Sequence, residues 1–414
     1  MPLGINEDGS VIIAKSLALP GWILGVDVDS TDNLLFIRYQ NLSKNETSLK
    51  NRGGISVYSL ADQRMLWQRP VNYFNQDPKL TSEGVLFVTM GKATSLLDLK
   101  TGNEVWKKKK MIPYWVDAKN RMFLAYKGSY MNGVSNELEG HSLATGEKMW
   151  SRKMSHVYGW NESGLLDDST RLIVSDGIHL VHMGNGEGPS YAMPTGASDY
   201  KEAVALGALG VVTGVLTGFA AVPTGPKKVM ELVSNVLSDD TVFYVASREN
   251  LFCLDRQLQP KWGYPIPDGM GSRSHLFARG DSLYMINMGT GYRNTIFDTS
   301  EAYAHEYLRL KVGWPFIACF DKRKGEKVWF RQLSDKKEMV EEFDINWEED
   351  ALMVLFSDHI RKYSLSGDSL LSEVSWDTEV NGKLLYLTIL LISCRILGIV
   401  HLISDINARI RFIV

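Results

Sequence analysis

A nine-residue pattern that ends in tryptophan recurs along the chain and constrains its fold more than any other feature. The three clear copies occupy residues 98–106, 142–150 and 321–329, and looser copies end at Trp67 and Trp262. In each clear copy, a strand-like stretch leads into a turn whose glycine can adopt positive φ, and a second strand-like stretch carries the indole. Each copy is therefore predicted to be a β-hairpin.

The spacing of the hairpins predicts the fold and locates two insertions. They recur about every 40 residues, which is the period of a β-propeller or a similar array. The step grows to about 70 residues between Tyr191, which stands where a tryptophan is expected, and Trp262. A second long step separates Trp262 from Trp329. Two insertions are therefore predicted, at 198–228 and at 289–313.

An apolar stretch closed by a polar turn precedes each hairpin and is typical of a strand. The seven stretches are Leu34–Tyr39, Val85–Met90, Met122–Tyr126, Leu172–Ser175, Val242–Ala246, Leu283–Met288 and Leu352–Phe356. Segments before them, such as Trp22–Val28, Pro113–Val116 and Val157–Trp160, can supply a fourth strand for each unit. The predicted fold class is all-β: a single β-propeller of four-stranded antiparallel blades over 1–414, with a short helical insertion or two on one face.

The number of blades is either seven or eight, and eight is favoured. An eighth unit begins at Gly382, and a strand over Val11–Leu17 could complete it by pairing the two ends of the chain. Residues 389–414 are atypical, because they have no Asp-Gly turn and no repeat tryptophan. They are interpreted as a degenerate last blade, as a poor membrane anchor, or as sequence that is not the natural terminus.

The Asp-x-x-Thr-Gly-x-x-x-Trp pattern resembles the tryptophan-docking repeat of the quinoprotein-like (PQQ-like) β-propeller superfamily, from about Trp22 to about Trp376. The tryptophans expected to pack between neighbouring blades are Trp67, Trp106, Trp150, Trp262 and Trp329. The superfamily contains quinone-dependent alcohol dehydrogenases and non-catalytic relatives, so the resemblance does not choose between these functions. It implies a location outside the cytoplasm, periplasmic or associated with the cell envelope.

The charge balance argues against a polyanionic partner. The formal net charge is −3, and the lysine run Lys107–Lys110 has no interleaved aromatic residue. No nucleic-acid partner is therefore expected. The stretch Met1–Asp8 lacks the basic start and the apolar run of a signal peptide, so none is predicted.

The first insertion contains a glycine-rich segment, 203–222, that carries no charged residue. Its glycines fall largely along one face of a helix, where they would let a second helix approach closely. Its length of about 20 residues is also what a bilayer requires. Three interpretations stay open: a helix buried on the propeller, a segment that enters or docks on a membrane, and an oligomer contact.

The second insertion is predicted to hold a short helix over 299–310, with Thr299 or Ser300 as its cap. In an up-and-down blade, the loop between strands two and three and the connection to the next blade leave the same face. Both insertions and the polar loops Asn41–Gly54 and Lys127–Gly140 are therefore expected on one face, which is the candidate binding surface. Its candidate interaction residues are Tyr292, Arg293, Tyr303, His305, Tyr307, Gly210, Gly214 and Gly218.

No residue set in the sequence predicts a catalytic, cofactor-binding or metal site. The resemblance to quinone enzymes would require Ca²⁺ ligands and an aspartate base, and the adjacent cysteine pair typical of those enzymes is missing. His179 and His182 are three residues apart in a strand and should point to opposite faces. Cys253 and Cys319 are predicted to be buried free thiols. Three carboxylate pairs precede strands in turn-like settings, where aspartate bonds its own backbone: Asp27 with Asp29, Asp167 with Asp168, and Asp239 with Asp240.

The predicted function is that of a non-catalytic binding or scaffolding propeller that engages a protein or peptide partner through its elaborated loop face. No cofactor is expected. Two alternatives stay open, a quinone (PQQ)-dependent oxidoreductase and a membrane-anchored propeller that uses 203–222.

Overall fold

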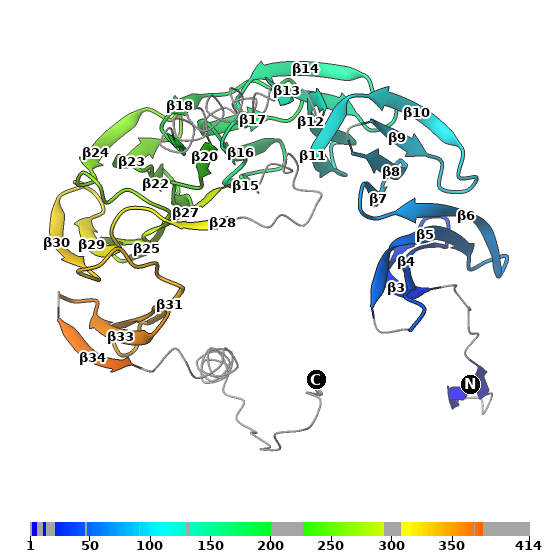
Figure 1. The fold of residues 1–414 in the computed structure, drawn as a ribbon. Coiled ribbons are helices and arrows are strands. Elements are labelled where there is room, and N and C mark those ends of the chain that lie inside the picture. Colours follow the sequence, from blue (N-terminus) through cyan, green and yellow to red (C-terminus); the bar gives the residue numbers. More distant parts are fainter. Residues whose placement is uncertain are drawn as a thin grey trace, which may run out of the picture.

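The computed structural model describes residues 2–5, 11–13, 21–45, 48–90, 92–129, 133–199, 227–293, 308–367 and 369–375. Within these residues every regular element is a β-strand. The strands form eight four-stranded antiparallel sheets and one two-stranded sheet. Figure 1 shows the four-stranded sheets following one another around an arc, from blue near the N-terminus to orange. The predicted all-β propeller of four-stranded antiparallel blades is confirmed.

Seven of the sheets, blades 1 to 7, follow the repeat of the sequence. Blades 1 to 3 consist of β3 (Trp22–Asp29), β4 (Leu34–Leu42), β5 (Leu49–Ser59) and β6 (Arg64–Asn72); β7 (Gln76–Thr81), β8 (Gly84–Thr89), β9 (Ala93–Leu97) and β10 (Glu104–Lys109); and β11 (Met111–Asp117), β12 (Met122–Ser129), β13 (Gly133–Ser142) and β14 (Lys148–Lys153). Blades 4 and 5 consist of β15 (Glu162–Leu165), β16 (Thr170–Val174), β17 (Gly177–His182) and β18 (Ser190–Ala192); and β21 (Leu237–Ser238), β22 (Val242–Ala246), β23 (Asn250–Asp255) and β24 (Pro260–Pro265). Blades 6 and 7 consist of β25 (Ser274–Arg279), β26 (Ser282–Asn287), β29 (Phe316–Asp321) and β30 (Lys327–Gln332); and β31 (Glu342–Asn346), β32 (Ala351–Leu355), β33 (His359–Ser364) and β34 (Leu370–Ser375).

The seven apolar stretches predicted as strands are the second strands of the seven blades. They are apolar on both sides because neighbouring blades cover both faces of each sheet. In β22, Phe243 packs with Val174 of blade 4, whereas the adjacent Tyr244 packs with Met285 of blade 6. Successive side chains of a strand point to opposite faces, so one strand contributes to two cores. The hydrophobic core therefore lies between consecutive blades.

The prediction that Val157–Trp160 forms the first strand of blade 4 is wrong. That strand is β15, which begins at Glu162. The chain turns at Gly159, which has a φ of 74°, and the Trp160 ring packs on Tyr114 of blade 3 with 5.0 Å between ring centroids. The aromatic side chain serves packing between blades here rather than a strand.

The prediction of long polar loops at Asn41–Gly54 and Lys127–Gly140 is also wrong. Strands β4 and β5 extend into the first stretch, where Leu42 pairs with Leu49. Strands β12 and β13 extend into the second in the same way. Cross-strand backbone hydrogen bonds satisfy these polar segments, so they form long hairpins.

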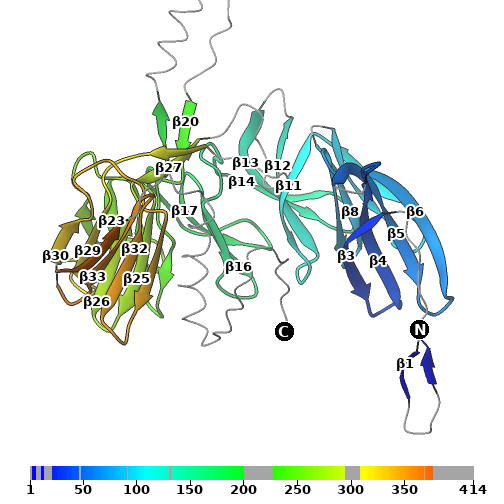
Figure 2. The same ribbon diagram turned by 60° about the horizontal axis from the view of Figure 1, so that its bottom comes forward.

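The eighth four-stranded sheet, here called the bridging sheet, is built from the two insertions. Its strands are β19 (Ala197–Asp199), β20 (Lys227–Met230), β27 (Thr290–Arg293) and β28 (Leu308–Lys311). At its centre, β20 pairs antiparallel with β27, with Met230 opposite Tyr292. Because β20 leads into blade 5 and β27 belongs to a connection within blade 6, the sheet links the two sides of blade 5. Figure 2 shows β20 and β27 at the upper edge of the blades.

The described ends of both insertions are strands rather than helices. Residues 308–310, predicted as the end of a helix over 299–310, lie in β28, because they pair with β27. The rest of that predicted helix and the glycine-rich segment 203–222 lie outside the described residues.

Eight blades were favoured from the sequence, and the described residues form eight four-stranded sheets, the eighth of which is the bridging sheet. Strand β2 (Val11–Ile13) lies in the N-terminal stretch expected to complete the last blade, and it pairs with β1 (Pro2–Ile5) instead. Pairing with a near neighbour closes a short loop, which costs less entropy than pairing the two ends of the chain. The predicted unit at Gly382 and the segment 389–414 lie outside the described residues.

The repeat tryptophans connect blades to their successors through a glycine turn. The indole of Trp67 in blade 1 lies against Gly102 in blade 2, where an added Cβ would come within 2.7 Å of the ring. Its N–H donates a hydrogen bond of 2.8 Å to the carbonyl of Leu99. The glycine also has a φ of 70°, so both its conformation and its lack of a side chain are required. The same contacts recur for Trp106 with Gly146 and Leu143, and for Trp150 with Gly186 and Met183.

The other residues of the repeat hold the glycine turn in shape. Asp98 accepts hydrogen bonds from the backbone N–H of Thr101 at 2.7 Å and from the Thr101 hydroxyl at 2.8 Å. The hydroxyl hydrogen bond lowers the pKa of Asp98. The stretch Gly184–Gly188 includes Gly186 and is the docking turn of blade 4.

The docking contact is incomplete on both sides of blade 5. Trp262 of blade 5 lies against Gly325 of blade 6, but its indole N–H has no hydrogen-bond partner among the described residues. Between blades 4 and 5, Tyr191 meets Phe252 edge to face, with 5.1 Å between centroids. The last repeat tryptophan, Trp329, packs near Tyr284 of its own blade in the core shared with blade 7.

Replacing a docking glycine should destabilise the propeller. Gly146→Ala adds a Cβ within 2.7 Å of the Trp106 ring at a φ of 67°, so we expect a loss of about 1–3 kcal/mol in the free energy of unfolding. Gly164→Ala is the control, because nothing lies within 4 Å of its added Cβ. Urea unfolding midpoints measure both. Equal midpoints for the two variants would contradict the docking role of the glycine.

The indole N–H should contribute more to the free energy of unfolding at Trp106 than at Trp262. Trp106→Phe keeps a ring on the glycine turn but removes the donor to the buried carbonyl of Leu143, whereas Trp262→Phe removes an N–H that has no described partner. We expect Trp106→Phe to cost about 1–2 kcal/mol more in urea unfolding. A larger loss for Trp262→Phe would refute this.

Candidate functional site

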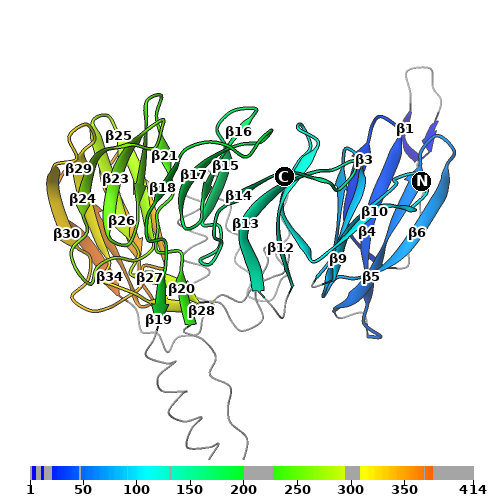
Figure 3. The ribbon, with the colours of Figure 1, turned by 90° about the horizontal axis from the view of Figure 1, so that it is seen from above.

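The described ends of both insertions lie on one face of the propeller. The connections between strands two and three, and those from blade to blade, end on this side, here called the loop face. Figure 3 shows it at the bottom, with the bridging sheet and the ends at which β4 and β12 leave their blades toward β5 and β13. The pairing of β20 with β27 confirms that the two insertions meet, as expected from the blade topology.

Two of the predicted interaction residues lie in the bridging sheet. Tyr292 and Arg293 are the last residues of β27, opposite Met230 and Val229 of β20. The remaining candidates, Tyr303, His305, Tyr307, Gly210, Gly214 and Gly218, lie outside the described residues.

A small cavity lies beside the bridging sheet, where the first strands of blades 4 and 6 begin. We call it the inner-strand pocket, and its volume is about 100 Å³. It is bounded by the start of β15, by the segment between β20 and β21, and by the start of β25. Its lining residues are Asn161, Glu162, Glu231, Val233, Ser234, Asn235, Arg273, Ser274 and His275.

Arg273 joins this pocket to the bridging sheet. Its guanidinium lies 3.1 Å from the carboxylate of Glu231 and donates a hydrogen bond of 2.9 Å to the hydroxyl of Tyr292. Glu231 has a φ of 59°, a left-handed conformation that is uncommon for residues with a side chain. Burial raises the pKa of Glu231, and the charge of Arg273 partly offsets this. The predicted residue Tyr292 thus contacts a pocket that the sequence did not reveal.

The side chain of Asn235 makes with one wall of the pocket the pair of hydrogen bonds that a neighbouring strand would make. Its side-chain amide donates a hydrogen bond of 3.1 Å to the carbonyl of Leu276 and accepts one of 2.7 Å from the N–H of the same residue. These two hydrogen bonds connect the segment that leads into blade 5 to β25. Because β25 also carries His275, whose pKa is lowered by burial and by the charge of Arg273, the wall contributes an imidazole that favours its neutral form.

Asn161 and Glu162 form the opposite wall of the inner-strand pocket. One carboxylate oxygen of Glu162 accepts a hydrogen bond from the backbone N–H of Val236. Burial raises the pKa of Glu162, and that hydrogen bond opposes the effect. The side-chain oxygen and nitrogen of Asn161 are both buried and have no hydrogen-bond partner among the described residues. In sequence these two residues look like an ordinary polar turn before a strand, so no local signal distinguishes them.

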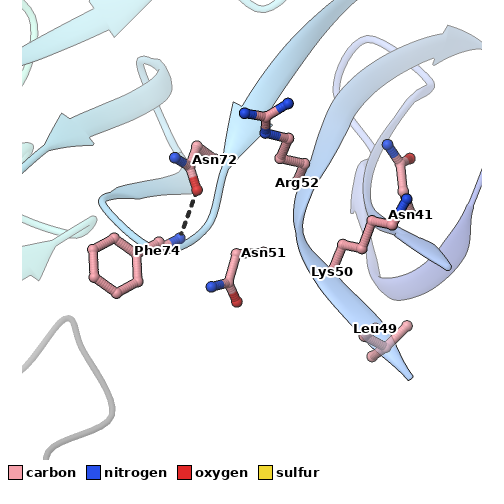
Figure 4. A pocket seen from close by; sticks show the side chains of 7 residues that line it. All are labelled: Asn41, Leu49, Lys50, Asn51, Arg52, Asn72 and Phe74. Carbon is pink, nitrogen blue, oxygen red and sulfur yellow. Dashed lines mark hydrogen bonds between the residues drawn. The ribbon is translucent and has the colours of Figure 1, made fainter. Parts of the chain in front are cut away.

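A second, open hollow lies on the loop face of blade 1. It has a volume of about 800 Å³ and is lined by Asn41, Leu49, Lys50, Asn51, Arg52, Asn72 and Phe74 (Figure 4). The Phe74 ring is 69% exposed, and its backbone N–H donates a hydrogen bond of 3.2 Å to the side chain of Asn72. Amides, two cationic side chains and one exposed ring suit recognition of a polar surface.

The residues considered for chemistry serve the fold in the described part of the chain. Asp167 accepts two backbone hydrogen bonds of 2.7 Å in its own turn, and Asp29 and Asp239 accept similar ones. His179 is buried and His182 is exposed, as expected for opposite faces of β17. Both described cysteines, Cys253 and Cys319, are buried free thiols, and burial raises the pKa of Cys253 to about 11.

No group of three or more histidine, cysteine or acidic side chains among the described residues is placed to hold a metal ion. No helix in that part of the chain has the length and apolarity needed to cross a membrane.

The outer membrane protein assembly factor BamB family matches residues 31–259, more than half of the chain. This chain belongs to the BamB family of PQQ-like β-propellers. The match covers blade 1 from β4 onward, blades 2 to 4, and blade 5 up to β23, including the clear tryptophan repeats at Trp106 and Trp150. No curated protein matches the chain by sequence.

Several solved propellers are similar in fold. BamB from Moraxella catarrhalis is 12% identical, with 85% of this chain and 87% of that chain covered and a TM-score of 0.38. The quinohemoprotein alcohol dehydrogenase ADHIIG from Pseudomonas putida HK5 is 11% identical, with coverages of 86% and 68% and a TM-score of 0.36. The C-terminal WD40 domain of Sif2 is 8% identical, with 89% of each chain covered and a TM-score of 0.34.

Removing the Glu162 carboxylate should change how stability depends on pH. Since its pKa is raised in the folded state, Glu162 favours folding most at pH values below its ordinary pKa of 4.5, and this contribution is lost as the pH rises through the raised value. We therefore expect Glu162→Gln to raise the melting temperature relative to wild type at pH 7 and to change it little at pH 4. Thermal unfolding at both pH values measures this. If Glu162→Gln lowers the melting temperature at pH 7, relative to wild type, more than it does at pH 4, the raised pKa of Glu162 is contradicted.

Proposed function

We propose that this chain is a non-catalytic scaffolding propeller, located outside the cytoplasm, that binds a protein or peptide partner through its loop face. Membership of the BamB family supports this, because the family is described as an assembly factor for outer membrane proteins. A factor of that kind works by contact with other polypeptides. The location outside the cytoplasm is proposed on the same ground.

The observation that carries the proposal is the bridging sheet. Strands from two insertions, one between blades 4 and 5 and one within blade 6, pair with each other on the loop face, although the blades themselves do not need these segments for their four strands. Arg273 and Tyr292 then connect the sheet to the inner-strand pocket. Elaboration of one face of a rigid scaffold, with a polar pocket beside it, is typical of a binding surface.

Crosslinking from matched positions on the two faces tests this proposal. A photo-crosslinking residue replaces Lys311, which is exposed at the end of β28, or Lys119, which is exposed in the turn between β11 and β12 on the opposite face. In the membrane and soluble fractions of the source cells, we expect a discrete protein adduct from position 311 that excess unmodified protein suppresses. Position 119 should give none. Equal adducts from both positions, or none from position 311, would overturn the proposed binding face.

A further inference from the structure

One carboxylate of the inner-strand pocket, that of Glu162, is paired with no cation from the part of the chain that the structure describes. Glu162 is partly buried, and within the described part of the chain the N–H of Val236 is the only hydrogen-bond donor to its carboxylate. No described lysine, arginine or histidine shifts its pKa. Carboxylates withdrawn from water are normally paired with a positive charge, because burial without a partner is costly. Among the described residues, Glu162 therefore lacks the counter-charge that such a position usually has.

The neighbouring amide of Asn161 is unpaired as well. Its side-chain oxygen and nitrogen are both buried, and the described residues offer no partner to either. Such groups are rare in folded proteins, since an unmade hydrogen bond costs roughly 1–3 kcal/mol. Asn161 and Glu162 line the same cavity, so one ligand can contact both.

The other charged groups of the pocket do not fill this role. Arg273 is engaged by Glu231 and by the hydroxyl of Tyr292. His275 favours its neutral form, because burial and the charge of Arg273 lower its pKa. The cation that would complete the Glu162 wall therefore has to come from outside the described part of the chain.

We propose that the inner-strand pocket receives a lysine or arginine side chain from the protein partner. The cationic head donates to the free oxygen of Glu162 and to the side-chain oxygen of Asn161, and the Asn161 amide donates to a backbone carbonyl of the partner. Charge-assisted hydrogen bonds of this kind are stronger than neutral ones. A cavity of about 100 Å³ suits one side-chain head rather than a whole small molecule. An acidic side chain would meet Glu162 directly, and an apolar one would leave the carboxylate and the amide unpaired.

This inference rests on the proposed function, which it makes more specific. The probe is a fluorescein-labelled nonapeptide of alanine, serine and glycine with one central arginine. Three further peptides carry lysine, citrulline or glutamate at the centre. Citrulline has the shape of arginine without its charge. Fluorescence anisotropy with the full chain measures binding of each peptide.

We expect the arginine and lysine peptides to bind at least about tenfold more tightly than the citrulline and glutamate peptides. Glu162→Gln and Asn161→Ala should each reduce binding of the arginine peptide to the level of the citrulline peptide. Glu137→Gln is the matched control, an exposed carboxylate in β13, and should leave binding unchanged. Thermal unfolding verifies that all three variants are folded.

Equal binding of the arginine and citrulline peptides, full binding by Glu162→Gln, or no binding of the arginine peptide would overturn this inference. Those results would not decide the proposed function, because crosslinking from position 311 is measured separately. If crosslinked adducts from position 311 persist in Glu162→Gln, the proposed scaffolding function is supported, but the inner-strand pocket is not the site that holds the partner. If the chain that is otherwise wild type gives no adduct from position 311, the proposed scaffolding function itself is rejected.

Discussion

The rest of the structure depends on one contact, an indole ring laid on the glycine turn of the next blade. At Trp67, Trp106 and Trp150 the ring excludes a side chain from the turn, and the indole N–H donates to a carbonyl of the same turn. The contact therefore sets both the distance between two sheets and their relative shift. Because each blade docks on its successor, apolar second strands such as β22 are enclosed from both sides. Packing and hydrogen bonding act on the same residue pair.

The bridging sheet lies where this contact is incomplete. Blade 4 offers Tyr191 rather than an indole, and Trp262 of blade 5 docks without a described acceptor for its N–H. Strands from the connection before blade 5 and from within blade 6 pair across this region. The two insertions thus add backbone hydrogen bonds in a region where the docking is incomplete. They also place Tyr292 beside the inner-strand pocket, so the same segments serve the fold and the proposed binding face.

The inner-strand pocket shows polar groups that stability alone does not explain. Burial raises the pKa of Glu162, which means that the ionised carboxylate opposes folding at neutral pH. Asn161 adds an amide without described partners. Residues that reduce stability are commonly retained where they bind a ligand, because the ligand supplies the missing interaction. This is the physical basis for assigning the pocket a cationic partner group.

The sequence by itself determined the blades, because the repeat acts locally. An aspartate, a glycine turn and an indole within nine residues specify a hairpin and its contact, and the spacing located both insertions. It did not determine that β20 pairs with β27, that β2 pairs with β1, or that Asn161 and Arg273 line one pocket. Those associations join segments from different blades or compete with other pairings of equal local propensity. Only the positions of the folded sheets decide them, because cross-strand pairing and burial depend on which chain segments the packing of the blades brings together.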